Sequence, residues 1–176
     1  MRIIAGTLKN RELKTPHGRK THPMSEKARG GLFNVLGDVE GLTFLDAFAG
    51  SGGLAFEAAS RGAGEVIAIE KDRAAHSIID QNLAELKLPN VHVVRANANG
   101  WSIHNMEKQF DIVLLDPPYD DLQTNLITTL IKRHVKKSGL AVLSWPGKTA
   151  IPDFDQTEVA ATKNYGDNQL VFYRKI

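Results

Sequence analysis

From residue 42 onward, short apolar runs alternate with segments of helical pattern, and this alternation limits the possible folds more than any other feature. The runs have the length and the β-branched content of buried strands. We predict strands at 43–48, 65–70, 91–95, 111–116 and 139–145, and helices near 53–61, 72–87 and 121–136. Strands separated by helices form βαβ units, so we expect a mostly parallel sheet covered on both faces.

Both ends of the chain depart from this rhythm. The strand-like runs 157–163 and 169–174 are joined by Tyr165-Gly166-Asp167-Asn168, which predicts a hairpin and therefore an antiparallel edge. Before the alternating region, Ser25 is expected to cap a helix over 26–37 that ends at Gly37. We therefore predict a Rossmann-like α/β domain over residues 25–176, preceded by a short basic N-terminal arm, residues 1–24.

Within this arm, residues 3–6 and 12–14 are expected as short strands, and Thr15-Pro16-His17-Gly18 as a turn. Residues 1–29 carry eight Lys or Arg and two Glu, a net charge of +6, whereas residues 30–176 carry 14 basic and 18 acidic residues, a net charge of −4. A basic arm on an acidic body favours contact with a polyanion, although a solvated leader would carry the same charges. The side chains expected to bind RNA are Arg2, Lys9, Arg11, Lys14, Arg19, Lys20, His22 and Arg29.

The composition excludes several classes of site. There is no cysteine, which excludes a disulfide framework, a thiolate nucleophile and a Cys-based metal centre, and we expect no metal. No apolar run approaches the roughly 20 residues that span a bilayer, and the first residues lack the apolar stretch of a secretory signal. We expect a cytoplasmic protein without a membrane partner, acting as a monomer.

A glycine turn, Asp46-Ala-Phe-Ala-Gly50-Ser-Gly52-Gly, leads directly from the first predicted strand into a helix. Its glycines permit positive φ and a close approach of ligand to backbone, and the helix start offers unpaired N–H groups. The turn alone fits NAD as well as other adenosine ligands. Asp46 favours S-adenosylmethionine, because a carboxylate there can hold the ligand's ammonium group but would repel a pyrophosphate.

Two further strand ends complete the expected cofactor site. Glu70 stands where a carboxylate accepts hydrogen bonds from a ribose diol, although it could instead be a surface acid paired with the basic side chain of Lys71 or Arg73. Asn97 could accept from the adenine amino group and the N–H of Ala98 could serve a ring nitrogen, unless Asn97 only shapes a turn. The residues assigned to the cofactor are Asp46, Phe48, Gly50, Gly52, Glu70, Lys71, Asn97 and Ala98.

The tetrapeptide Asp116-Pro117-Pro118-Tyr119 follows a predicted strand, so it is expected at the same edge of the sheet. The prolines remove N–H donors and leave carbonyl acceptors, and the tyrosine ring offers a surface on which a base can stack. The Asp116 carboxylate and the Pro117 carbonyl would accept both hydrogens of an exocyclic NH2 and turn its lone pair toward a sulfonium methyl. We therefore predict amine methylation, with Asp116, Pro117 and Tyr119 as the catalytic residues.

These motifs resemble those of the class I S-adenosylmethionine-dependent methyltransferases of amino groups. The segments Arg2-Ile-Ile-Ala-Gly6, Leu13-Lys-Thr-Pro16, Leu32-Phe-Asn-Val-Leu36 and Tyr165-Gly166 narrow the resemblance to the bacterial 16S rRNA (guanine(966)-N2)-methyltransferase family, over essentially the whole chain. The resemblance implies a seven-stranded sheet and methyl transfer to the 2-amino group of a guanine. It also implies 16S rRNA as the partner, within a partly or fully assembled small ribosomal subunit.

Other functions remain open at this point. Adenine, cytosine and guanine all carry an exocyclic amine, so an adenine-N6 methyltransferase of DNA or RNA, or a protein-glutamine methyltransferase, would use the same tetrapeptide. A catalytically silent RNA-binding module could keep the fold without the chemistry. Asp46 and the proline pair disfavour a nicotinamide oxidoreductase. Gly30 and Gly31 depart from the family pattern, because helix formers are usual there.

Overall fold

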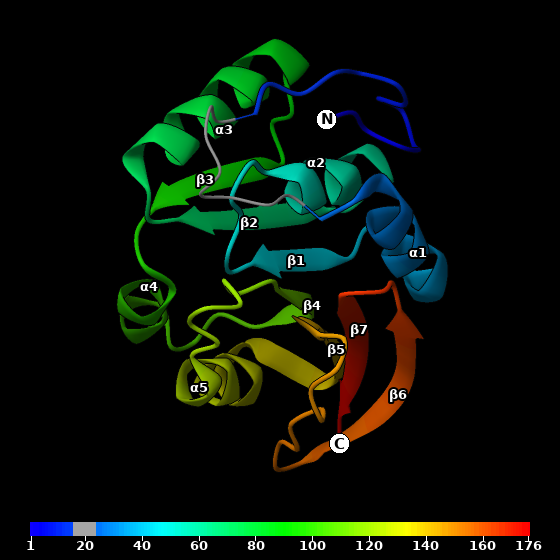
Figure 1. The fold of residues 1–176 in the computed structure, drawn as a ribbon. Coiled ribbons are helices and arrows are strands. Elements are labelled where there is room, and N and C mark those ends of the chain that lie inside the picture. Colours follow the sequence, from blue (N-terminus) through cyan, green and yellow to red (C-terminus); the bar gives the residue numbers. More distant parts are fainter. Residues whose placement is uncertain (16–23) are drawn as a thin grey trace.

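The computed structural model describes residues 1–15 and 24–176 and centres on a seven-stranded sheet of order β3-β2-β1-β4-β5-β7-β6 (Figure 1). The strands are β1 (Thr43–Asp46), β2 (Glu65–Glu70), β3 (Val91–Arg95), β4 (Phe110–Leu115), β5 (Val135–Pro146), β6 (Thr157–Asn164) and β7 (Asn168–Lys175). The helices are α1 (Glu26–Leu36), α2 (Gly53–Ser60), α3 (Arg73–Leu86), α4 (Ala98–His104) and α5 (Thr124–His134). β1 to β5 pair in parallel, and β7 pairs antiparallel with both β5 and β6. The predicted parallel sheet with an antiparallel hairpin is confirmed.

The differences from the sequence prediction are local. The helix α4 was not predicted, because its seven residues are too few to establish a helical period. The segments 3–6 and 12–14 do not form strands; a single bridge joins Arg2 to Glu12 instead. The turn expected at 15–18 lies outside the described residues from position 16 onward. Ser25 does cap α1, since its side chain accepts a hydrogen bond from the N–H of Ala28 at 3.1 Å.

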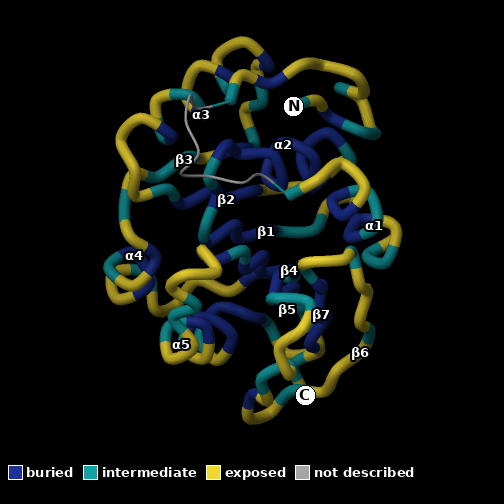
Figure 2. The backbone as a smooth tube through the Cα atoms, in the orientation of Figure 1, coloured by how far each residue is buried: buried dark blue, intermediate teal, exposed yellow. Residues whose placement is uncertain are grey.

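Two apolar layers lie between the sheet and its helices. The central strands β1, β2 and β4 are mostly buried, whereas the edge strand β6 is mostly exposed (Figure 2). Successive residues of a strand face opposite layers: Phe44 packs in the layer under α1, α2 and α3, whereas Leu45 packs in the layer under α4 and α5. Both faces are therefore covered, and the strand ends remain as places where a ligand can bind. No helix of the described residues is both long and apolar enough to cross a membrane.

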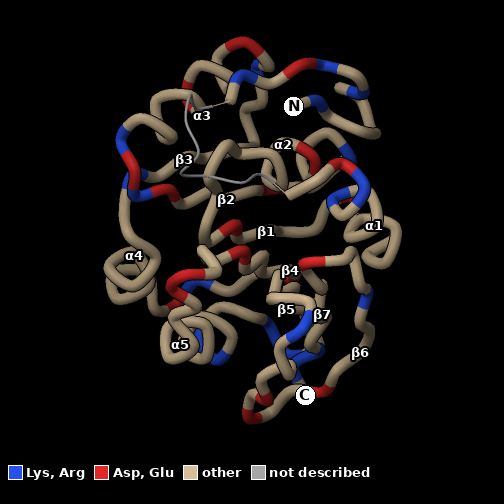
Figure 3. Tube along the Cα trace, viewed as in Figure 1, with Lys and Arg blue, Asp and Glu red and all other residues tan. Residues whose placement is uncertain are grey.

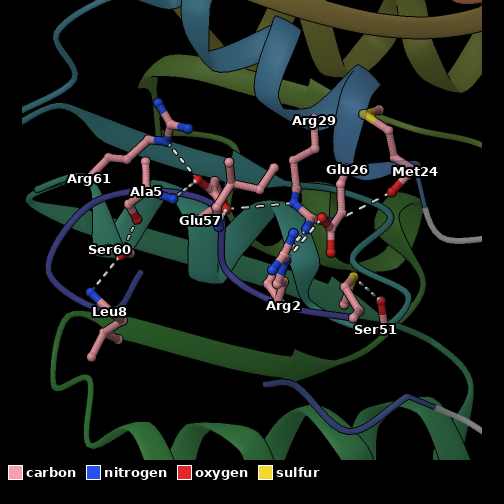
Figure 4. A network of polar contacts seen from close by, with 12 residues as sticks. Arg2, Ala5, Leu8, Met24, Glu26, Arg29, Ser51, Glu57, Ser60 and Arg61 are labelled. Carbon is pink, nitrogen blue, oxygen red and sulfur yellow. Dashed lines mark hydrogen bonds and ion pairs between the residues drawn. The ribbon is translucent and has the colours of Figure 1, made fainter. Parts of the chain in front are cut away.

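The first 15 residues pack against α2 as part of this domain. Ile3 and Leu13 are buried in the apolar layer under α1, α2 and α3. The carboxylate of Glu57, on α2, accepts hydrogen bonds from the backbone N–H groups of Ile4 at 2.8 Å and Ala5 at 3.0 Å (Figure 4). The start of the basic arm is thus fixed to the helix that follows the glycine turn.

A close contact explains the glycine in the middle of α1. A Cβ added at Gly31 would lie only 1.7 Å from the hydroxyl oxygen of Tyr165, in the loop between β6 and β7. The tyrosine itself packs against the same apolar layer as α1. Gly31 therefore lets the C-terminal hairpin dock on α1, which outweighs the helix propensity that an alanine would add.

Candidate active site

Three carboxylates lie at the carboxyl ends of adjacent parallel strands, which we call the strand-end rim. Asp46 ends β1 and Glu70 ends β2, while Asp116 directly follows β4. β1 pairs with both neighbours, with Asp46 in register with Ala68 of β2 and Leu114 of β4. Figure 3 shows acidic segments where β1 and β4 end. The structure thus brings residues 46–53 and 116–119 to one edge of the sheet, where ligands bind in open α/β folds.

Asp46 is a buried carboxylate without a counter-charge. It is 1% exposed, and neither carboxylate oxygen has a hydrogen-bond partner among the described residues. Burial raises the pKa of Asp46 to about 7, and the charges of Asp116 and Glu70 add to the rise. The backbone N–H groups of Phe48 and Ala55 lie near the carboxylate without hydrogen-bonding geometry and partly oppose the rise. An ionised group in such a place is costly unless a cation or donor meets it. The ammonium group of S-adenosylmethionine fits this requirement.

The glycine turn is hydrogen-bonded to the carboxylate of Glu70. Gly50 and Gly52 have φ angles of 55° and 79°, a region that favours glycine. The Gly50 N–H donates to Glu70 Oε2 at 2.8 Å, and the Asp72 N–H donates to Glu70 Oε1 at 2.7 Å. A Cβ at Gly52 would lie 2.7 Å from the ring of Phe56. Each oxygen of Glu70 keeps a second lone pair that a ribose hydroxyl could use.

The other residues expected at the cofactor follow the same strand ends. Asn97 caps α4, because its Oδ1 accepts from the Gly100 N–H at 2.7 Å. The expected acceptor for adenine is thus already used once and retains one lone pair. Ala98 is the first residue of α4, where a backbone N–H has no partner within the helix. Phe48 is half-buried, and Lys71 is exposed just beyond β2.

The tetrapeptide after β4 combines a partly buried acid with an accessible ring. Burial raises the pKa of Asp116 to about 6, and a hydrogen bond from the Ser144 side chain acts in the opposite direction. Pro117 is buried, whereas Tyr119 is 41% exposed. The hydroxyl groups of Tyr119 and Ser144 are hydrogen-bonded, with 2.8 Å between their oxygens. The exposed ring can therefore meet a ligand while its hydroxyl is anchored on β5.

Sequence reasoning missed Ser144. It is 3% exposed near the carboxyl end of β5, and it is the polar residue in the apolar run Leu143-Ser144-Trp145. Because a buried polar group needs a hydrogen-bond partner, a serine inside a predicted buried strand was the signal that the sequence offered.

The residues expected to bind RNA have different environments. Lys9 and Arg11, which we call the exposed arm pair, are both exposed. Arg2 forms an ion pair with Glu26, with 3.1 Å between Nε and Oε2, and Lys14 pairs with Glu85. The other three candidates outside α1, namely Arg19, Lys20 and His22, lie outside the described residues.

The prediction that Arg29 binds RNA is wrong. Arg29 is 1% exposed on the buried side of α1, where its Nη2 donates to the Arg2 carbonyl at 2.6 Å and its Nε lies 3.6 Å from Oε2 of Glu57 (Figure 4). Burial lowers the pKa of Arg29, and the carboxylate of Glu57 opposes this effect. Counting charge along the chain missed this role because it ignored the helix face. Glu57, the only acid in the apolar segment 53–60, was the available signal.

Comparisons with known proteins agree with this arrangement. The profile of the family described as conserved hypothetical protein 95 matches residues 1–174. YlbH of Bacillus subtilis, provisionally named an rRNA methyltransferase, is 32% identical and the match covers 99% of both chains. The ribosomal RNA small subunit methyltransferase D of Escherichia coli K12 is 39% identical over 120 residues, which are 68% of this chain and 60% of that protein.

Among solved structures, the Escherichia coli protein yhhF, provisionally described as a methyltransferase, has a TM-score of 0.89 at 31% identity, covering 99% of this chain and 97% of that one. The predicted class I methyltransferase fold and the expected S-adenosylmethionine cofactor are confirmed. The chain therefore belongs to the conserved hypothetical protein 95 family, a family of S-adenosylmethionine-dependent methyltransferases.

Proposed function

We propose that this protein transfers a methyl group from S-adenosylmethionine to the 2-amino group of a guanine in 16S rRNA. The observation that carries the proposal is the buried, unpartnered Asp46 carboxylate beside the glycine turn, on the same rim as Asp116. One carboxylate suits a cationic cofactor, and the other suits the amine that receives the methyl group.

Residues at three strand ends would each bind a different part of the cofactor. Asp46 would accept hydrogen bonds from the ammonium group, and Glu70 would accept from the ribose hydroxyls while it holds Gly50. The Ala98 N–H and the remaining lone pair of Asn97 would meet the adenine edge. The cofactor supplies a methyl group activated on a sulfonium, and the protein determines where that methyl group points.

The acceptor side works through position and charge. Asp116 and the Pro117 carbonyl would accept the two N–H bonds of the exocyclic amine, so that its lone pair is directed at the methyl carbon. As the nitrogen becomes positive in the transition state, the nearby carboxylate stabilises it. Tyr119, exposed at the same place, would stack on the base and hold it in the plane that this geometry needs.

The choice of an rRNA substrate rests on the relatives' names and on charge. The Escherichia coli relative is named a ribosomal RNA small subunit methyltransferase. The exposed arm pair lies in the segment that packs on α2, the helix that begins at the glycine turn. Exposed basic side chains on this segment would contact phosphates of the bound RNA.

The test supplies labelled S-adenosylmethionine with naked 16S rRNA, small ribosomal subunits, DNA and bulk protein in parallel. We expect label in 16S rRNA, free or within the subunit, and mapping should place it on the 2-amino group of one guanine. Asp116→Asn should abolish transfer, whereas Asp120→Asn, a matched change at an exposed acid four residues after Asp116, should not. Label on adenine, on DNA or on protein would overturn the proposed substrate.

A further inference from the structure

The glycine turn is in contact with the start of the N-terminal arm. The Ser51 hydroxyl donates to the sulfur atom of Met1, with 3.8 Å between the two atoms. A Cβ added at Gly53, the first residue of α2, would lie 2.8 Å from the same sulfur and 3.3 Å from Nη1 of Arg29. The arm and α1 therefore both contact the segment that joins β1 to α2.

One buried carboxylate holds the arm and Arg29 in this place. Glu57, on α2, is 0% exposed. Its Oε2 accepts from the Ile4 N–H at 2.8 Å and lies 3.6 Å from Nε of Arg29 (Figure 4). Its Oε1 accepts from the Ala5 N–H at 3.0 Å and from Nε of Arg61 at 2.8 Å. Because each oxygen accepts from one N–H of the arm, an amide side chain, with a single oxygen, could not replace it.

We propose that Glu57 is a positioning residue for cofactor binding, which holds the arm and Arg29 against the glycine turn and so keeps the turn in its binding shape. The inference rests on the glycine turn as part of the cofactor site. It gives the arm a second role besides its contact with RNA. One segment can serve both purposes, because its backbone is bonded to α2 while the side chains of the exposed arm pair stay accessible.

Support of this kind affects affinity because the turn is rich in glycine. Glycine loses more conformational freedom on ordering than any other residue, so a turn with glycines at positions 50, 52 and 53 is costly to hold in one shape. A loop that is ordered before its ligand arrives binds that ligand more tightly. The contacts at Ser51 and Gly53 order the turn in addition to the hydrogen bond between the Gly50 N–H and Glu70.

The chemistry of Glu57 fits positioning better than stability alone. It is the only charged residue of α2, a helix whose residues are all buried. Apolar residues of similar volume often stabilise a protein as well as a buried ion pair does. A carboxylate with four partners, by contrast, is satisfied in only one arrangement of the arm, α1 and α2. Glu57 therefore defines where the arm lies relative to the turn.

Glu57→Gln is the decisive variant. One of the two N–H groups of the arm would then face an NH2 donor, and the negative charge beside Arg29 would be lost. We expect the affinity for S-adenosylhomocysteine in calorimetry to fall about tenfold. Arg61→Met is the matched control, because it removes the other ion pair of the same carboxylate but leaves the arm and Arg29 bonded. It should lower Tm without changing this affinity.

A second variant and a second measurement decide the question even if Glu57→Gln fails to fold. Arg29→Lys keeps a positive charge beside Glu57 but lacks the guanidinium that reaches Gly53 and the Arg2 carbonyl. It should also weaken S-adenosylhomocysteine binding about tenfold. Amide hydrogen exchange without ligand should be faster at residues 50–53 in Arg29→Lys and Glu57→Gln than in the wild type, and unchanged in Arg61→Met.

Two results would overturn the inference. One is unchanged affinity together with unchanged exchange at residues 50–53 in Arg29→Lys. The other is an equal loss of affinity in Arg61→Met, since a general loss of stability would then explain the effect. A wild-type protein that binds S-adenosylhomocysteine but labels no rRNA would instead overturn the proposed function, and the binding and exchange measurements would still decide the role of Glu57.

Discussion

Asp46→Asn should stabilise the protein without cofactor and abolish cofactor binding. Asn resembles the protonated carboxyl in shape and hydrogen bonding, so the change removes the cost of the charge and little else. The buried carboxylate has its pKa raised to about 7 from 3.8. Because a tenfold change in proton affinity corresponds to about 1.4 kcal/mol, the ionised form costs roughly 4 kcal/mol in the folded state.

The pH dependence follows from the direction of the shift. Between the unfolded pKa of 3.8 and the folded value of about 7, the folded state holds more of the proton than the unfolded state. Stability is therefore lost as pH rises through this window, and the full cost is present above about pH 7. The gain from Asp46→Asn should approach roughly 4 kcal/mol at pH 8 and fall below about 2 kcal/mol at pH 5.

Urea unfolding at pH 5 and pH 8 measures this gain, and thermal unfolding should show it as a rise in Tm of about 8–16 °C at pH 8 for a domain of this size. Asp111→Asn is the matched control. Although partial burial acts to raise the pKa of Asp111, hydrogen bonds from Lys136 and Thr43 hold it below its usual value, so removing that charge should destabilise the fold. Equal or lower stability of Asp46→Asn at pH 8, together with unchanged cofactor affinity in calorimetry, would refute the reasoning.

Three further predictions concern the surroundings of the site. Glu57→Ala leaves the buried charge of Arg29 without its carboxylate partner and should cost about 3–5 kcal/mol, seen as a loss in Tm of about 6–20 °C; a loss below about 2 °C would show that the ion pair is dispensable. Gly52→Ala should weaken cofactor binding at least tenfold in calorimetry, whereas Gly37→Ala, at a similar φ of 74° but in open space, should not; equal effects would place the defect outside the glycine turn. Replacing each residue of the exposed arm pair by alanine should reduce the salt slope of RNA binding by about 0.7 per single-strand phosphate contact, and an unchanged slope would remove the pair from the RNA interface.

The strand ends could be predicted from the sequence because the apolar runs are short and bounded. β1 and β2 end at an acid and β4 ends just before one, and parallel pairing brings the carboxyl ends of neighbouring strands to one edge. That reasoning placed Asp46, Glu70 and Asp116 together, and the sheet order has their strands as neighbours. The location of the site therefore follows from local pattern and parallel pairing alone.

The residues that connect elements could not be predicted in the same way. Arg29 counted as one more basic residue in the sequence, yet its helix turns it toward Glu57 on α2. Ser144 matters because of Tyr119, 25 residues earlier, and that contact exists only after β4 and β5 pair. Such contacts depend on which faces meet in the folded chain, and neither hydrophobic period nor turn chemistry carries this information.

A crystal structure of the protein with S-adenosylhomocysteine tests the central claim most directly. The account predicts the ligand on the strand-end rim, with its amino nitrogen about 3 Å from an oxygen of Asp46, its ribose hydroxyls on Glu70 and its sulfur facing Asp116. A ligand bound elsewhere, or one bound there while both oxygens of Asp46 stay unpartnered, would contradict it.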